Sequence, residues 1–150
     1  MALRIIRKTG DEALKTVCKE VTSFNAHLHQ LLDDMKDTMI EADGVGLAAP
    51  QVGVIKRAIV FLNGEEIMEM INPVITSQSG SCIDSEGCLS VPDVSGKVDR
   101  PTQITVDYQT RYGKKKTMVV NGFTARIICH ETDHLNGVLF IEKAFDIERR

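Results

Sequence analysis

Apolar residues between Ser23 and Asp43 recur at spacings of three and four, which is the period of one face of an α-helix. The positions that repeat are Leu28, Leu31, Leu32, Met35, Met39 and Ile40. Gly44 follows directly and is typical of the residue just past a helix end. The pattern predicts an amphipathic helix over residues 23–43 with one buried face.

The next segment, GVGLAAPQVG at residues 44–53, has neither helical nor strand periodicity. Its glycines are unfavourable in a regular helix, and the segment is too apolar for an exposed loop. We therefore expect a buried, extended segment here.

Several short apolar runs further along the chain are typical of β-strands. They are Ala58–Leu62, Glu66–Met70, Val74–Ser77, Ile104–Tyr108 and Thr117–Asn121. Asn63-Gly64 is a turn signal between the first two runs, and residues 111–114 join the last two. The span from Gly80 to Arg100 has no clear pattern, and we expect irregular structure there.

A second helix is predicted from Gly122 to Asn136, and Gly137 supplies its stop. Its apolar stripe comprises Ala125, Ile128 and Leu135. Residues 138–150 carry little periodic signal. Strands followed by a central helix indicate an α+β fold, in which small antiparallel or mixed β-sheets pack around the helix that contains residues 130–134.

The composition agrees with one ordinary globular domain spanning residues 1–150. Hydrophobic residues make up 43% and charged residues 26% of the chain, and these values argue against disorder. The net charge of −3 argues against a nucleic-acid-binding protein, so we expect no nucleic-acid specificity. The basic run Lys114–Lys116 is interpreted as the solvated tip of a hairpin rather than as a docking patch for polyanions.

The N-terminal residues lack the apolar run of a signal peptide. No stretch approaches the roughly 18 apolar residues of a membrane helix, so we expect a cytoplasmic location and no membrane partner. The cysteines are Cys18, Cys82, Cys88 and Cys129. In a cytoplasmic chain they are expected to be thiols rather than a disulfide framework.

The strongest chemical signal is the pentapeptide HETDH, from His130 to His134, on the second predicted helix. Histidines at i and i+4 lie on one helix face, so both imidazoles can bind one metal ion. Glu131 lies about 100° around the helix and can reach a metal-bound water without being a ligand. Metal-assisted hydrolysis requires this combination of a Lewis acid, an ionisable water and a carboxylate. A histidine pair at this spacing also occurs without a metal, so the pentapeptide alone is moderately specific.

A catalytic metal site usually has three protein ligands and one open position. After the pentapeptide the chain offers only the carboxylates Glu142, Asp146 and Glu148. Before it, Cys88 lies in the segment EGCLS and could supply a thiolate, although an ordinary buried thiol is the alternative. Adjacent side chains on a helix face different directions, so Cys129 is not expected to bind the same ion as His130. We assign Cys129 to the core or to the surroundings of the ligands.

Three segments in this order resemble the signature motifs of the peptide deformylases, namely GVGLAAPQ at residues 44–51, EGCLS at 86–90 and HETDH at 130–134. The similarity extends over essentially the whole chain. That family removes the formyl group from the N-terminal formyl-methionine of newly made bacterial proteins. Its natural metal is a ferrous ion. The resemblance implies one divalent cation here, Fe(II) in preference, which Zn(II), Ni(II) or Co(II) can replace.

Carried over to this chain, the resemblance makes Cys88, His130 and His134 the metal ligands. It makes Glu131 the general acid/base that acts on the metal-bound water. The Gln51 side-chain amide and the Leu89 backbone N–H become the donors to the formyl oxygen, where a tetrahedral oxyanion develops.

The substrate implied is a nascent formyl-methionyl peptide. Candidates for its apolar pocket are Val45, Leu89, Phe123, Ile127 and the aliphatic stem of Arg126, and core positions are the alternative for nearly all of them. Gly44 and Gly46 fit the close approach of a peptide backbone, which could pair as an added strand. Asp133 is expected to lie beside the ligand histidines and to pair with Arg100.

Two departures from the family pattern matter. Few residues follow the second helix, so the long C-terminal helix that some members use at the ribosome is not expected, although transient ribosome contact stays open. Cys129 stands where many members have glutamine. Two other functions also stay open: a general HExxH-type metalloprotease with a carboxylate as third ligand, and a metal-binding module without enzymatic activity.

Overall fold

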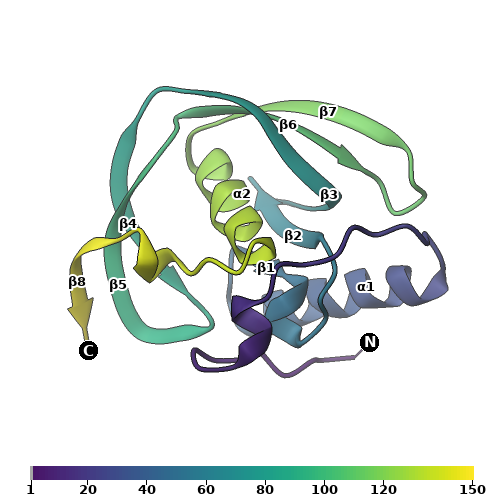
Figure 1. Ribbon diagram of the computed structural model, residues 1–150, viewed down its shortest axis with the longest axis horizontal. Coiled ribbons are helices and arrows are strands. Elements are labelled where there is room, and N and C mark those ends of the chain that lie inside the picture. The colour runs from purple at the N-terminus through teal and green to yellow at the C-terminus, as the bar shows by residue number, and fades with distance from the viewer. Residues whose placement is uncertain (1) are drawn as a thin grey trace.

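Helix α2 (Gly122–Leu135) lies in the middle of the molecule, between two β-sheets (Figure 1). The computed structural model describes residues 2–150. The larger sheet has the order β1 (Gly46–Ala48), β2 (Ala58–Asn63), β3 (Glu66–Ser79), β6 (Gln103–Gln109) and β7 (Lys115–Asn121). The smaller sheet has the order β4 (Cys82–Cys88), β5 (Val91–Arg100) and β8 (Phe145–Arg149). All strand pairs in both sheets are antiparallel, so the predicted α+β class is confirmed.

Strand β2 is buried on both faces, because the two helices cover opposite sides of it. Ile59 and Phe61 belong to the core that α2 shares, whereas Val60 belongs to the core of α1 (Ala26–Glu41). Successive side chains of a strand point to opposite faces, so a strand between two helices reads as one continuous apolar run. This explains why its sequence, AIVFLN, shows no alternation.

Helix α1 is shorter at both ends than the predicted range 23–43. The side chain of Asn25 caps its N-terminus by accepting a hydrogen bond from the backbone N–H of Leu28 at 3.1 Å. Ala42 caps the other end, and the N–H of Gly44 still donates to Met39 at 2.9 Å. Helix α2 agrees with its prediction. Gly137, which lies just past its C-terminal end, has a φ of 73°.

The two strands predicted at Glu66–Met70 and Val74–Ser77 are one long, bent strand, β3. The pairing with β6 shifts register between Ile71 and Val74, and Asn72 there has a φ of 52°. Asn72 tolerates this conformation because its side chain exchanges hydrogen bonds with the backbone of Val21, at 2.8 and 2.9 Å. The polar residue therefore marks a bulge and not a strand end.

The expectation of irregular structure from Gly80 to Arg100 is wrong, because this span forms β4 and β5. Most of β4 is exposed, so it lacks the apolar alternation that betrays a half-buried strand. Only a few side chains of the hairpin enter a core, among them Val91 and Val98 beside Phe140. Backbone pairing holds these strands together, and a hydrophobicity pattern does not reveal it.

Residues 46–52 are buried as expected, but only β1 is extended; Ala49–Val52 form a 3-10 helix, η2. Two further 3-10 helices are η1 (Glu12–Lys15) and η3 (Phe140–Glu142). All four cysteines are free, as predicted. Within residues 2–150, neither α1 nor α2 combines the length and the apolar character that crossing a membrane demands.

Candidate metal centre

Cys88 and the two histidines of α2 converge at the junction of the two sheets. Their donor atoms lie within 4.8 Å of one another. The Cys88 Sγ is 3.3 Å from His134 Nε2. His130 directs its Nδ1 to Glu86 at 2.9 Å, which leaves its Nε2 for a cation. Thiolate and imidazole donors together suit Fe(II) or Zn(II), so these residues form a possible metal site.

The local fold explains this convergence. Cys88 is the last residue of β4, and it pairs with Val91 across the two-residue turn Leu89-Ser90. His130 and His134 are one turn apart on α2, with ring centroids 5.1 Å apart. A hairpin end therefore supplies the sulfur, and one face of the central helix supplies both imidazoles.

Glu86 is the residue of this site that the sequence analysis missed. Its carboxylate accepts hydrogen bonds from His130, from Arg100 at 2.9 and 3.0 Å, and from Arg126 at 2.7 Å. Burial alone would raise the pKa of Glu86, but the hydrogen bonds from His130 and Arg100 hold it well below its usual range. An ionised acceptor on Nδ1 fixes the orientation of a ligand histidine. The only available signal was its position in EGCLS.

The predicted pair of Asp133 and Arg100 is present, with 2.6 Å between Asp133 Oδ2 and Arg100 Nη1. Asp133 also contacts Lys143 Nζ at 3.1 Å. Within residues 2–150 it makes no hydrogen bond with a histidine, since Nδ1 of His130 is hydrogen-bonded to Glu86 instead. Arg100 thereby links the two carboxylates, one from β4 and one from α2.

The two histidines have opposite pKa shifts. Burial lowers the pKa of His134, which favours the neutral imidazole that binds a metal ion. Burial would also lower the pKa of His130, but hydrogen bonds with Cys88 and Glu86 raise it to about 10. The two histidines therefore differ in how readily each loses its proton.

Glu131 lies on the turn of α2 that carries the histidines, and 4% of its surface is exposed. Burial raises its pKa to about 7. Within residues 2–150 its Oε1 has no hydrogen-bond partner. A Cβ at Gly46 would lie 2.5 Å from Glu131 Oε2 and 2.9 Å from Ile127 Cγ2, so a larger residue there would force these side chains to shift. An unpartnered buried carboxylate of raised pKa is suited to proton transfer.

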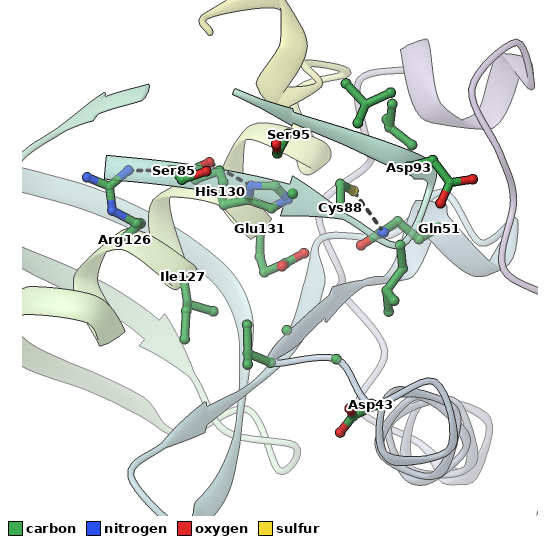
Figure 2. Close-up of a pocket in the computed structure, with 18 of the residues that line it drawn as sticks. Asp43, Gln51, Ser85, Cys88, Asp93, Ser95, Arg126, Ile127, His130 and Glu131 are labelled. Atoms are coloured by element: carbon green, nitrogen blue, oxygen red, sulfur yellow. Dashed lines mark hydrogen bonds and ion pairs between the residues drawn. The ribbon is translucent and has the colours of Figure 1, made fainter. Parts of the chain in front are cut away.

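Gln51 is held in place from both ends of its amide. Its Oε1 accepts from the Ala48 backbone N–H at 3.0 Å. Its Nε2 donates to Ser90 Oγ at 3.1 Å and lies 3.6 Å from Cys88 Sγ, the contact drawn in Figure 2. The N–H that faces the sulfur is the one that could turn to an oxygen acceptor in the cleft. Ser90 was not singled out from the sequence.

A cleft of ≈ 490 Å³ opens beside these residues, and Figure 2 shows Asp43 and Asp93 at separate parts of its wall. The predicted site residues that line it are Gly44, Val45, Gly46, Gln51, Cys88, Leu89, Phe123, Arg126, Ile127, His130 and Glu131. His134 does not line it and is buried below. Val45 and Phe123 are 43% and 62% exposed, as expected for pocket rather than core residues. Arg150 also lines the cleft and was not expected.

Comparison with known proteins gives one consistent result. A family model described as “Polypeptide deformylase” matches residues 3–150. A peptide deformylase from Caldicellulosiruptor bescii is 54% identical over 143 residues, which are 95% of this chain and 86% of that protein. The crystal structure of peptide deformylase from Thermotoga maritima has a TM-score of 0.95 at 38% identity and covers 97% of this chain and 99% of its own. A class I type b peptide deformylase from Acinetobacter baumannii has a TM-score of 0.93 at 40% identity, over 95% and 99%.

Proposed function

The chain belongs to the polypeptide deformylase family and is an enzyme, and we propose that it hydrolyses the formyl amide of N-terminal formyl-methionine with one divalent cation. Cys88, His130 and His134 would hold that cation. One observation carries the proposal: these three donors lie within 4.8 Å of one another, beside the unpartnered buried carboxylate of Glu131 and in an open cleft.

Fe(II) is the cation we propose, with Zn(II), Ni(II) or Co(II) as replacements. When bound, a divalent cation would supply a Lewis acid that makes a water molecule acidic at neutral pH. The residues present fit this role, because Glu86 orients His130 and burial keeps His134 neutral.

Gln51 and Leu89 would stabilise the negative charge that develops on the formyl oxygen. Hydrogen bonds to Ala48 and Ser90 hold the Gln51 amide in place, and only the N–H that faces Cys88 Sγ would turn to the formyl oxygen. The Leu89 backbone N–H lies in the turn that follows Cys88, on the same side of the cleft. Donors held rigidly before the reaction are worth more than donors that must reorient.

Glu131 would carry the proton. With a pKa raised to about 7, its carboxylate can accept a proton from the attacking water and then deliver it to the leaving amine. Its Oε1 has no competing hydrogen bond among residues 2–150. The same group thus serves as base and then as acid.

The formyl-methionyl peptide would bind along β1, which ends the strand order of the larger sheet and lines the cleft at Gly46. An extended peptide can pair with such an edge through its backbone. Val45, Phe123 and Ile127 would then surround the methionine side chain. Nascent chains in the cytoplasm are the substrates we propose, with at most transient contact with the ribosome.

The test is the release of formate from formyl-Met-Ala-Ser by protein purified and loaded with Fe(II) without oxygen. We expect turnover by the wild type. Glu131→Gln should keep the metal and lose most of the turnover, because it removes the proton carrier and leaves the ligands. Metal-loaded wild type that releases no formate would contradict the proposal, and an unaffected Glu131→Gln variant would point to a site without enzymatic use.

The alternative of a general metalloprotease is tested with Cys88→Ala. A protease with a carboxylate as third ligand would retain its metal and cleave internal peptide bonds. Under our proposal the variant loses metal affinity and formate release together, and the wild type leaves unformylated peptides intact. No carboxylate after residue 134 lines the cleft within residues 2–150, which disfavours the alternative.

A further inference from the structure

The turn Leu89-Ser90 lacks the backbone angles that are usual in a two-residue hairpin turn. Two-residue hairpin turns usually need a positive φ at one or both positions, because only those types match the twist of the strands. Among residues 2–150, positive φ angles occur at neither Leu89 nor Ser90. The pairing of β4 with β5 also shifts register between Gly87 and Cys88, directly before the turn. The sulfur and the Leu89 N–H therefore lie on a turn of unusual geometry, whose position contacts from other segments can influence.

Such contacts come from the N-terminal segment, residues 7–9. Lys8 Nζ donates to the Leu89 carbonyl at 3.0 Å. The Thr9 backbone N–H donates to the Ser90 carbonyl at 2.8 Å. Both carbonyl groups of the turn are thus bound by neighbouring residues of one extended segment.

The same segment also holds the second oxyanion donor. The Arg7 backbone N–H donates to the Gln51 carbonyl at 2.7 Å. The Arg7 guanidinium lies against Gly53, where a Cβ would come within 2.9 Å of it. Three consecutive residues therefore fix the two loops that carry Gln51 and Leu89, which are far apart in sequence.

We propose that residues 7–9 form a brace that sets the distance between the Gln51 amide and the Leu89 N–H, and that Lys8 is a positioning residue for deformylation. This inference rests on the proposed function. Lys8 does not line the cleft, so it acts on the reaction only through the turn. Within residues 2–150, its bond to Leu89 is the one hydrogen bond that a side chain of the brace donates to the turn, so it can be removed without altering the backbone.

The experiment compares Lys8→Met with wild type, both loaded with Fe(II) without oxygen. Methionine keeps the length and the apolar stem and removes the donor. We expect kcat on formyl-Met-Ala-Ser to fall about three- to tenfold, since small misplacement of a donor is costly. KM should stay within about twofold and the melting temperature within about 2 °C, because an exposed contact adds little to stability. Lys8→Arg, which keeps a donor, should restore most of the rate.

Lys15→Met is the matched control. It removes an exposed lysine contact of the same length, 3.0 Å to Glu142, that touches neither loop. A loss of rate in Lys15→Met equal to that in Lys8→Met would overturn the proposal. An unchanged kcat in Lys8→Met would overturn it too, as would a rise in KM alone or a failure of arginine to restore the rate.

Amide hydrogen exchange separates this proposal from the proposed function. In Lys8→Met, peptides that cover residues 87–91 should exchange faster, while those in α2 should not change. If the wild type released no formate, the proposed function would fail, and the exchange rates alone would still decide on the brace. Equal exchange of the turn in both proteins would overturn it.

Discussion

At the scale of single residues, Glu131 Oε1 and His134 Nδ1 have no hydrogen-bond partner within residues 2–150, whereas other side chains of the site are fixed by hydrogen bonds. Gln51 shows this most clearly, because both ends of its amide are fixed by hydrogen bonds within the fold. At Gly44 and Gly46 a Cβ would lie 2.8 Å from the side chain of Leu89 and 2.5 Å from that of Glu131, so a larger residue would make these side chains move. The sequence motif identified these positions, but the reason for each lies in contacts from distant segments.

Replacing Gln51 with leucine should separate binding from catalysis. Leucine fills a similar volume and removes the donor to the developing oxyanion. We expect kcat to fall by about 10²–10³, with a much smaller change in KM. Steady-state formate release, with metal content measured in parallel, checks this. Loss of metal from the variant would show that the contact with Cys88 matters more than the donor.

The cysteines should differ sharply in reactivity. Burial raises the pKa of Cys18 and of Cys129 to about 11, so few of these thiols are ionised at pH 8. Cys82 is exposed on β4. We expect a maleimide at pH 8 to modify Cys82 first in the metal-loaded protein, as mass spectrometry of peptides would show. Modification of Cys129 at a similar rate would mean that α2 opens readily.

At the scale of elements, a cluster of charges joins helix α1 to the larger sheet. Glu69 on β3 binds Arg111 at 2.7 and 2.8 Å and Lys36 on α1 at 2.6 Å. Arg111 also reaches Asp33 at 2.8 Å. Burial would raise the pKa of Glu69, but the hydrogen bonds from Arg111 and Lys36 lower it overall. The folded state therefore favours the ionised carboxylate.

Glu69→Gln should destabilise the protein in a pH-dependent way. A carboxyl group with a lowered pKa in the folded state adds stability above its unfolded pKa and loses it as pH falls through the folded one. We expect a loss of about 1–2 kcal/mol in unfolding free energy at pH 7. The difference from wild type should shrink once the pH falls below the ordinary value of 4.5. Urea melts at pH 7 and pH 3.5 test this, and a constant difference would contradict it.

Elements with a clear apolar period could be predicted from the sequence, and those held by backbone pairing could not. Helices α1 and α2 were predicted because their buried faces repeat, and strand β2 because its apolar residues form one short continuous run. The hairpin of β4 and β5 was not, although it carries Cys88, because its residues are mostly polar and exposed. The motifs identified the candidate ligands. Glu86 and Lys8, in contrast, make contacts with residues distant in sequence, which no local sequence pattern predicts.

At the scale of the whole molecule, the three candidate metal ligands come from different parts of the fold. The sulfur comes from the smaller sheet, and the imidazoles come from the helix that packs on the larger one. The buried group of Glu86, Arg100, Arg126 and Asp133 crosses the same junction. A cation bound here would hold both halves together as well as serve the reaction.

Removal of the metal should therefore lower the melting temperature. A cation at a hundredfold excess over its dissociation constant adds about 2.7 kcal/mol, which is roughly 6–10 °C for a chain of this size. Calorimetry before and after treatment with a chelator measures this, and restoring Fe(II) should reverse it. Cys88→Ser should show a smaller response. An unchanged melting temperature after verified metal loss would contradict the prediction that the cation stabilises the fold.

The last strand of the larger sheet, β7, has consequences for how copies of this protein behave in a crowded solution. An edge strand exposes unpaired backbone N–H and C=O groups, with which a strand of a second chain can pair and so begin aggregation. Lys115 and Lys116 lie on this edge strand, and the hairpin tip adds Lys114. Their mutual repulsion would keep two such edges apart. The basic run Lys114–Lys116 would then oppose association between copies of the protein instead of serving as a docking site.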